Sequence, residues 1–352
     1  MNATRMDVTA VGMACSVGLS AASACAAMRA GLSAFEVLPY RDNQVRRPIT
    51  GSPVSVLPNH MGRDERLVDL LAMAIADALR GGGSRHEQVP LLVAVSEPEH
   101  PGGGATLAGE LVARVEHRLE RTFHPGLSRV LIGGSVAGYQ ALEAARKLLW
   151  ERRGSACLVC AVDSFIDARS LLWLEEHGRL KTQRNADGVI PGEAAACVRV
   201  ELRARTPRQS LAMIEGLGFA RELATVLNDE PLRAEGLVEA GQAALEEAGL
   251  RMEDMELRLS DVSGELYAFK EQTLALTRLL RVKRESLPLW LCAESIGEVG
   301  AAASLCQLVR VAQAWQRGYA PGARAMCFAS SISGARAVAV VRRPKQAGEA
   351  ER

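Results

Sequence analysis

The sequence predicts an α/β fold built from two similar halves. Apolar runs typical of strands alternate with amphipathic patterns typical of helices, as in α/β proteins with buried mixed sheets. This succession of elements occurs twice, and the 352 residues exceed the ~250–300 at which a single core usually stops growing. We therefore expect one half at residues 1–205, a second at 206–343, and a disordered polar tail at 344–352.

The first half shows short apolar runs separated by helical patterns. The expected strands cover residues 8–13, 91–96, 128–132, 156–162 and 194–202. The expected helices cover residues 20–30, 65–80, 109–121 and 137–152. In the helix at 65–80, apolar residues from Leu67 to Ala78 recur at helical spacing, which gives a stripe for a sheet to cover.

The second half repeats the pattern. A strand at 211–219 precedes a long helix at 231–248, which Gly249 ends as a C-cap. The elements expected after it are a strand at 256–261, a helix at 266–280, a strand at 289–293, a helix at 299–317, and strands at 324–329 and 335–342.

Composition excludes several classes of function. Lys and Arg together number 42 against 41 Asp and Glu, so the chain lacks the accumulated positive charge of nucleic-acid or anionic-membrane binders. The sequence contains no uninterrupted run of ~18 apolar residues, so we expect no transmembrane helix. We expect neither a nucleic-acid nor a membrane partner.

The eight cysteines lie mostly in apolar runs and are expected to be small buried side chains in a reducing compartment, which favours a cytoplasmic location. Cys157 and Cys160 form a C-x-x-C pair, but Leu158 and Val159 between them indicate the interior of a strand. The six histidines show no metal-ligand spacing and are expected on the surface or in the core. We expect no metal and no cofactor.

Four collinear segments resemble a known family. They are VTAVGMACSVGLSAASACAAMRAGLSAF (8–35), RNADGVIPGEAAACVRVEL (184–202), AGQAALEEAGLRMEDMELRLSDVSGE (240–265) and ESIGEVGAAASLCQLV (294–309). In this order and at these separations they are similar to the β-ketoacyl-[acyl-carrier-protein] synthases of the thiolase superfamily. The resemblance covers roughly residues 1–342, and its most specific part is the second segment, where Asp187-Gly188 and Gly192-Glu193 are expected to shape a turn beside the site. It implies a five-layered αβαβα fold and a dimer.

The family's nucleophilic cysteine lies at a sharp turn between a strand and a helix, whose N-terminus lowers the thiol pKa and supplies donors for an oxyanion. The matching segment is SRVLIGGSVAGYQALEAARKLLW (128–150). Aligned on Gly138 and Ala141, it places Ser135 at the nucleophile position. Ser135 has two interpretations, a helix N-cap and a nucleophile that needs an activating base.

The family's two catalytic histidines have no counterparts, because no histidine follows residue 177. The first position falls at or near Ser263, the second on Gly297 or Glu298, and a family lysine position holds Glu294 or Cys292. The closing loop FASSISGARAVAVV (328–341) keeps only Gly334 of the family's glycines, and its aromatic gate is missing. Positioned acid–base groups contribute ~10²–10⁴-fold each, so we expect this degenerate site to be unable to condense acyl chains.

The leading interpretation is a ketosynthase-like chain without condensing activity. Like chain-length factors, it would bind a ketosynthase-like partner as a homodimer or heterodimer, or bind an acyl chain or an acyl carrier protein. A variant makes it an accessory to a secreted effector, since such chains occur beside type VI secretion genes. The alternative is a serine acyltransferase or thioesterase with Ser135 as nucleophile and Glu298 as base. A third possibility is a condensing enzyme that recruits Cys157, Cys160 or Cys292.

Overall fold

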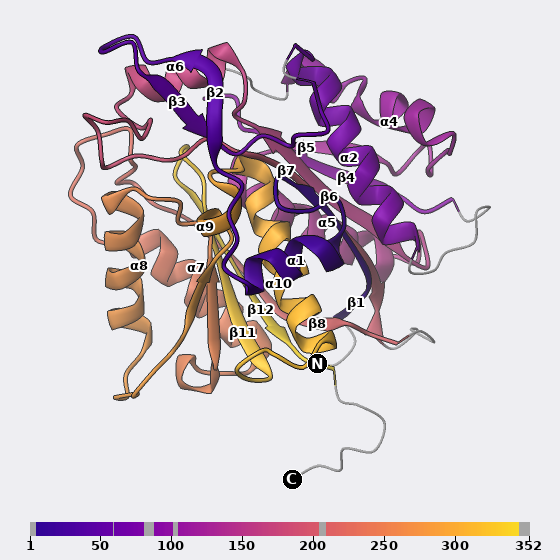
Figure 1. Ribbon diagram of the computed structural model, residues 1–352. Coiled ribbons are helices and arrows are strands. Elements are labelled where there is room, and N and C mark those ends of the chain that lie inside the picture. Colours follow the sequence, from indigo (N-terminus) through magenta and orange to yellow (C-terminus); the bar gives the residue numbers. More distant parts are fainter. Residues whose placement is uncertain (1–4, 59, 81–87, 101–104, 204–208, 345–352) are drawn as a thin grey trace.

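The computed structural model describes residues 5–58, 60–80, 88–100, 105–203 and 209–344. It confirms the α/β prediction: helices lie on both faces of a large mixed sheet and also between its two halves (Figure 1). The predicted boundary between residues 205 and 206 falls outside the described residues, as does the tail from 345 onward. No helix in the described ranges is long and apolar enough to cross a bilayer.

The N-terminal half contributes five strands, which lie in the order β1-β7-β6-β4-β5. Their bounds are β1 Met6–Cys15, β4 Leu91–Val95, β5 Arg129–Ile132, β6 Cys157–Ser164 and β7 Glu193–Leu202. β7 pairs antiparallel with β1 and β6, whereas β4 pairs parallel with β6 and β5. β5 is therefore the edge strand of this half.

The C-terminal half repeats this arrangement, in the order β8-β12-β11-β9-β10. Its strands are β8 Ala212–Arg221, β9 Leu257–Ser260, β10 Leu289–Leu291, β11 Arg324–Ser330 and β12 Ala335–Arg342. β12 pairs antiparallel with β8 and β11, and β9 pairs parallel with β11 and β10. Each half thus orders its strands first, fifth, fourth, second, third. The halves join where residues 6–8 of β1 pair with residues 212–214 of β8.

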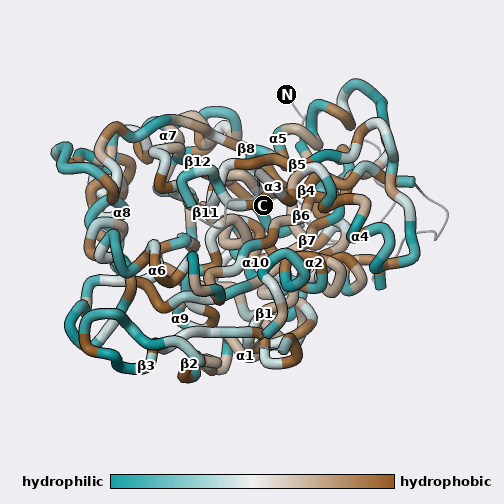
Figure 2. The backbone as a smooth tube through the Cα atoms, turned by 90° about the horizontal axis from the view of Figure 1, so that it is seen from above, coloured by the Kyte–Doolittle hydropathy of each residue, from teal (hydrophilic) through white to brown (hydrophobic). Residues whose placement is uncertain are grey.

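Three helical layers complete the five-layered fold. The middle layer contains α5 (Ala137–Trp150) and α10 (Ala303–Gln316), and α10 is buried from Ala303 to Trp315, as expected of a helix packed on all sides. α2 (Arg63–Arg80) and α4 (Leu111–Leu119) cover the N-terminal half. α7 (Glu235–Ala248) and α8 (Leu266–Leu279) cover the other (Figure 1). In Figure 2 the outer loops are largely hydrophilic and the central elements more apolar.

Several elements escaped the sequence prediction. They are the hairpin β2 (Glu36–Arg41) and β3 (Pro48–Gly51), and the short helices α3 (Ala105–Ala108), α6 (Ala168–Glu176) and α9 (Ala293–Ile296). The first helix, α1 (Ala21–Arg29), begins after the Ser20 cap close to its predicted start. The C-x-x-C pair lies buried in β6, which confirms the interpretation as a strand interior.

The predicted helix at 231–248 was wrong at its start. α7 begins at Glu235, because Ala234 takes a left-handed conformation (φ 56°). The Gly236 N–H, one of the first-turn donors, is satisfied by Glu222 Oε2 at 3.0 Å. The predicted strand at 289–293 ends at Leu291, since α9 begins at Ala293. The predicted helix at 299–317 begins with a 3₁₀ turn at Gly300–Ala302, so α10 starts only at Ala303.

Candidate functional site

Ser135 lies at the sharp turn between β5 and α5. A 3₁₀ turn, Gly134–Val136, connects the strand to the helix, and Gly134 has φ 63°, a left-handed conformation that glycine adopts at little cost. A Cβ on Gly134 would lie 2.4 Å from Glu97 Oε1, so this position needs glycine for space as well. Ser135 is 9% exposed and lines a cavity.

The predicted N-cap role of Ser135 is wrong. Gly133 precedes the 3₁₀ turn and Val136 precedes α5, and neither helix start has a side-chain cap. Val136 N–H instead donates to Ser331 Oγ at 3.3 Å, from the loop after β11. Within the described residues, the Ser135 side chain forms no hydrogen bond. The preference of serine for helix N-caps does not apply here, because Ser135 lies inside the 3₁₀ turn that begins with the left-handed Gly134.

The two positions expected for histidines meet in the same cavity. Ser263, in the loop after β9, donates a hydrogen bond from Oγ to Glu298 Oε2, and Glu298 Oε1 accepts the Gly300 N–H at 2.7 Å. Burial raises the pKa of the Glu298 carboxyl. In the part of the chain that the structure describes, no hydrogen bond joins Glu298 to Ser135. The proposed base is therefore occupied by other donors.

The cavity has a volume of about 70 Å³ and a strongly acidic lining. Its carboxyl groups belong to Glu97, Asp163, Asp261, Glu265, Glu271 and Glu298. Apolar side chains, among them Phe165, Val226 and Ile332, form part of the wall. A volume of this size has room for roughly five small groups, far less than the ~300–1,000 Å³ of drug-sized sites.

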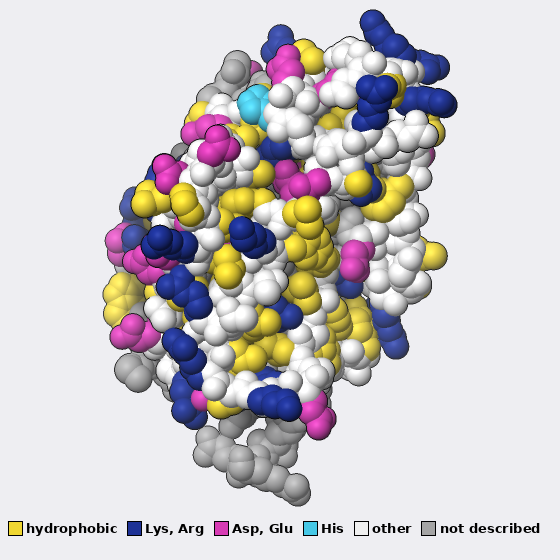
Figure 3. Space-filling view, turned by 90° about the vertical axis from the view of Figure 1, so that its left-hand side faces the viewer, with side chains coloured by type: hydrophobic (Ala, Val, Ile, Leu, Met, Phe, Trp, Pro, Cys, Tyr) yellow, Lys and Arg dark blue, Asp and Glu magenta, His cyan; other side chains and the backbone are white. Residues whose placement is uncertain are grey.

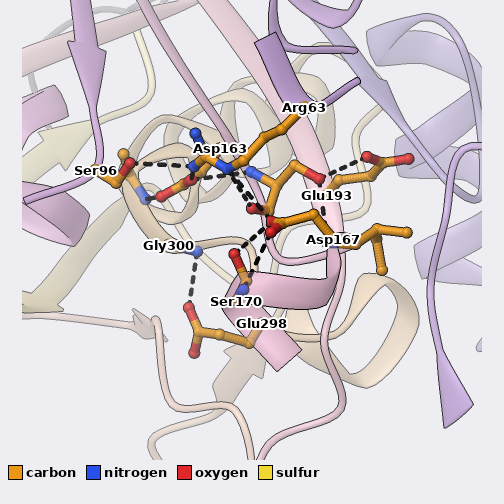
Figure 4. Close-up of polar contacts among 11 residues, drawn as sticks. Arg63, Ser96, Asp163, Asp167, Ser170, Glu193, Glu298 and Gly300 are labelled. Atoms are coloured by element: carbon orange, nitrogen blue, oxygen red, sulfur yellow. Dashed lines mark hydrogen bonds and ion pairs between the residues drawn. The ribbon is translucent and has the colours of Figure 1, made fainter. Parts of the chain in front are cut away.

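Three of these acids are neutralised by arginines. Glu271 pairs with Arg336 at 2.7 Å, and Glu265 accepts two hydrogen bonds of 2.7 Å from Arg179. Asp163 pairs with Arg63 at 2.7 Å. Arg63 also donates to Ser96 Oγ at 3.2 Å (Figure 4). Such bidentate and buried pairs fix the shape of the cavity wall.

The other acids receive hydrogen bonds from backbone N–H groups. Glu97 accepts from Ile332 at 3.1 Å and from Ser333 at 3.0 Å, and Asp261 accepts from Ser330 at 2.6 Å. Burial raises the pKa of Glu97, and it raises the pKa of Asp261 to about 7. Burial disfavours the charged form, so these carboxyls hold protons at higher pH than exposed ones do.

One histidine also lines the cavity, and its burial agrees with the expectation that the histidines lie on the surface or in the core. His100 is 3% exposed and packs edge-on against Phe165, with the ring centroids 4.5 Å apart. Burial lowers the pKa of its imidazole and so favours the neutral ring. His100 belongs to the N-terminal half, whereas the family's catalytic histidines come from the C-terminal half.

The acidic signature near residue 190 has a structural role. Glu193 accepts hydrogen bonds from Arg66, from Ser164 Oγ at 2.8 Å and from Val54 N–H at 2.8 Å, so it satisfies buried donors next to the site. Asp187 Oδ1 accepts the Leu266 N–H at the start of α8, at 2.6 Å. Both agree with the interpretation that this segment shapes a turn and satisfies backbone beside the cavity.

No family model and no curated protein matches the sequence. Solved structures do match. The oxazolomycin ketosynthase domain of Streptomyces albus superposes with a TM-score of 0.78 at 15% identity, covering 97% of this chain and 76% of that one. The ishigamide ketosynthase/chain length factor gives 0.79 at 16% identity, covering 97% of this chain and 100% of that one. The chain has the ketosynthase fold.

A third structure with the ketosynthase fold is a type II acyl-carrier protein in complex with its ketosynthase bound to the hexaketide. It has a TM-score of 0.78 and 15% identity, and the match covers 97% of this chain and 100% of that chain. In the chain described here, Ser135 lies at the turn before α5. It lines the same cavity as Ser263 and Glu298 of the C-terminal half. No cluster of three potential metal ligands occurs among the residues described.

The remaining site residues had weak sequence signals. Glu97 and Asp261 each follow the second strand of their half, at the end of β4 and of β9. Carboxyl ends of parallel strands commonly carry ligand-binding groups, and this rule would have singled out both acids. Arg336, inside β12, and Arg179, after α6, offered no such signal, because only the tertiary fold brings them to the cavity.

Proposed function

We propose that this chain is a ketosynthase-like protein that does not condense acyl chains and serves as a partner subunit. One observation carries the proposal. Where the resemblance to the family leads one to expect two imidazoles, the C-terminal half presents a serine and a half-buried glutamate that are hydrogen-bonded to each other. The Ser263 hydroxyl is already used by Glu298, and Ser135 has no base hydrogen-bonded to it in the described structure.

The electrostatics of the cavity support the same proposal. Condensation in the family draws on a malonyl unit, which carries a carboxylate. Six carboxyl groups line this cavity against two arginines, Arg179 and Arg336, and both arginines are already paired. A like charge placed beside these acids is disfavoured. An acidic cavity of about 70 Å³ is therefore a poor site for a malonyl thioester.

Two surfaces suit a partner. The edge strand β5 offers unpaired backbone groups, and Ile132 on it is 39% exposed. Near the cavity, Leu223 is 75% exposed, three residues before the lining residue Val226, and Leu266 is 68% exposed, directly before the lining residue Tyr267. The face that includes α8 carries hydrophobic side chains interspersed with Lys and Arg (Figure 3). We propose β5 for a second ketosynthase-like chain and the Leu223–Leu266 region for a carrier protein.

The proposal is tested in two steps. The purified chain is incubated with malonyl-carrier protein and an acyl primer, and neither carbon dioxide nor a β-keto product is expected. Sedimentation of the chain, alone and co-expressed with ketosynthases of the same cell, is expected to show a dimer that Ile132→Asp weakens at least tenfold. Val282→Asp, at a 46% exposed apolar position, is the matched control and should leave assembly unchanged. Product formation, or a monomer under all conditions, would overturn the proposal.

A serine acyltransferase or thioesterase is the second candidate. The observation in its favour is the free Ser135 hydroxyl, 9% exposed at a helix start, where first-turn N–H groups can stabilise an oxyanion. Mass spectrometry after exposure to acyl-carrier protein decides the matter. An adduct that disappears in Ser135→Ala establishes this function, whereas the partner role predicts no adduct. The cytoplasmic location and the secretion-accessory variant remain predictions.

A further inference from the structure

Three acids of the cavity have no positive partner. The arginine pairs account for Asp163, Glu265 and Glu271, which leaves Glu97, Asp261 and Glu298 without an ion pair in the described structure. The three come from separate segments of both halves. Each is anchored by at least one backbone N–H, so each carboxyl is held at the cavity wall with oxygen lone pairs left for a further donor.

Ser135 is a second, independent feature of the same cavity. Its side chain is polar and nine-tenths buried, lines the cavity, and has no hydrogen-bond partner in the described chain. The Ser135 oxygen is not sealed from the cavity space, so it is available to a ligand atom that enters the cavity. A hydroxyl oxygen can accept a hydrogen bond as well as donate one, so it can join the three carboxyls as an acceptor.

We propose that this cavity binds a small organic cation, a protonated primary amine on a short carbon chain. An ammonium group has three donors and no acceptor, which matches the carboxyl oxygens of the wall and the unbonded Ser135 hydroxyl. Its charge takes the place of the missing counter-charge of Glu97, Asp261 and Glu298. The apolar wall at Phe165, Val226 and Ile332 suits a few methylene groups. This inference does not depend on the partner role, since the cavity is built from this chain alone.

Other cations fit less well. The described residues provide no cluster that could hold a metal ion, and an inorganic cation would leave the apolar wall uncovered. A guanidinium group needs planar, bidentate acceptors, and the bidentate carboxylate of the cavity, Glu265, is already bound by Arg179. The chemistry and size of the cavity therefore favour an alkylammonium group.

Calorimetry with three probes of similar size tests the proposal. n-Propylammonium, 1-propanol and propionate differ mainly in charge, and n-propylammonium is expected to bind at least tenfold more tightly than the alcohol, with no binding of propionate. Glu298→Gln and Glu97→Gln should each weaken n-propylammonium about tenfold, the effect of losing one charged hydrogen bond. Glu239→Gln, on the exposed face of α7, is the matched control and should change the affinity less than twofold.

A circular-dichroism melt of each variant separates loss of binding from loss of fold. If a glutamine variant unfolds, Ser135→Ala takes its place, because it removes an acceptor without breaking a bond in the free protein, and it should weaken n-propylammonium about threefold. Equal binding of amine and alcohol, preference for propionate, or amine binding that none of the cavity variants weakens would each overturn the proposal. These outcomes leave the test of dimer formation and condensation untouched.

Discussion

The two halves of the molecule begin their central helices with matching turns. The N-half turn, Gly134–Val136, leads into α5, and the C-half turn, Gly300–Ala302, leads into α10. Both start with a left-handed glycine, at φ 63° and φ 47°. The two turns touch each other across the centre of the fold, where Gly138 of α5 approaches Ser304 of α10 so closely that a Cβ would lie 2.3 Å from Ser304 Oγ.

The turns differ in what neutralises their N–H groups. In the C-half turn, carboxylates do so: Asp163 Oδ2 accepts from Ala301 at 3.0 Å and Glu298 Oε1 from Gly300 at 2.7 Å. In the N-half turn, a neutral hydroxyl, Ser331 Oγ, accepts from Val136 at 3.3 Å. A helix N-terminus favours negative charge. Two carboxylates of the protein supply that charge at the start of α10, whereas no carboxylate accepts from the turn that leads into α5, which lies at the cavity. The duplicated fold thus closes one turn with its own carboxylates, whereas the matching turn has only a hydroxyl acceptor at the cavity.

The largest effect is expected from Asp163→Ala, which opens the C-half turn. The change removes the closer carboxylate of Arg63, whose side chain is 10% exposed and keeps only Asp167 at 3.6 Å, and it frees the Ala301 N–H. Removing one member of a buried pair costs about 3–5 kcal/mol of the free energy of unfolding. Chemical denaturation measures it. Asp69→Ala breaks the ion pair with Arg118, whose side chain is 58% exposed, and should cost at most about 1 kcal/mol; equal losses in the two variants would contradict the comparison.

The next largest difference between the two turns is expected from alanine substitutions at their left-handed glycines, Gly134 and Gly300. A residue forced into the left-handed region costs roughly 1–2 kcal/mol, which Gly249→Ala reports alone, because a Cβ there meets no neighbour. At Gly300 the Cβ would lie 2.3 Å from Asp163 Oδ2. Arg63 holds the same carboxylate through Oδ1, so we expect a total of about 3 kcal/mol. At Gly134 the obstacle is the Glu97 carboxyl, which is held by backbone N–H groups of one loop and by no arginine, so we expect about 2 kcal/mol.

Denaturation curves of the three alanine variants rank these costs. A larger loss at Gly134 than at Gly300 would show that the N-half turn, not the C-half turn, is the rigid one.

A smaller effect is expected from pH, through Asp261 in the C-terminal half. The pKa of its carboxyl is raised to about 7 in the folded chain, above the ~3.9 of an unfolded one. Between pH 4 and 7 the folded chain therefore binds more protons, and this group's contribution to stability declines as pH rises through that window. Between pH 5 and pH 8, the free energy of unfolding of Asp261→Asn should rise relative to that of the wild type by on the order of 1 kcal/mol. Parallel stability profiles of the two proteins would refute the raised pKa.

The sequence predicted more of the fold than of the cavity. Periodicity showed a doubled α/β pattern, and collinear segments brought Ser135, Ser263 and Glu298 to one cavity. Contacts distant in sequence were out of reach, such as Glu222 satisfying the start of α7 or Glu97 accepting from Ser333. Sequence rules consider only the neighbours of a residue along the chain. They therefore cannot predict a hydrogen bond to a group on a distant segment.

Ser135 itself shows the limit of such a rule. A serine before a helix predicts a cap, and a lost cap costs about 1 kcal/mol. The structure instead places the hydroxyl in the cavity without a partner, so Ser135→Ala should change the free energy of unfolding by less than about 0.5 kcal/mol. Ser20→Ala removes a cap that accepts from Ser23 N–H at the start of α1 and should cost about 1 kcal/mol in the same denaturation experiment. If the two serines proved equally costly, the N-half turn would be closed by Ser135, and the contrast with the C-half turn would disappear.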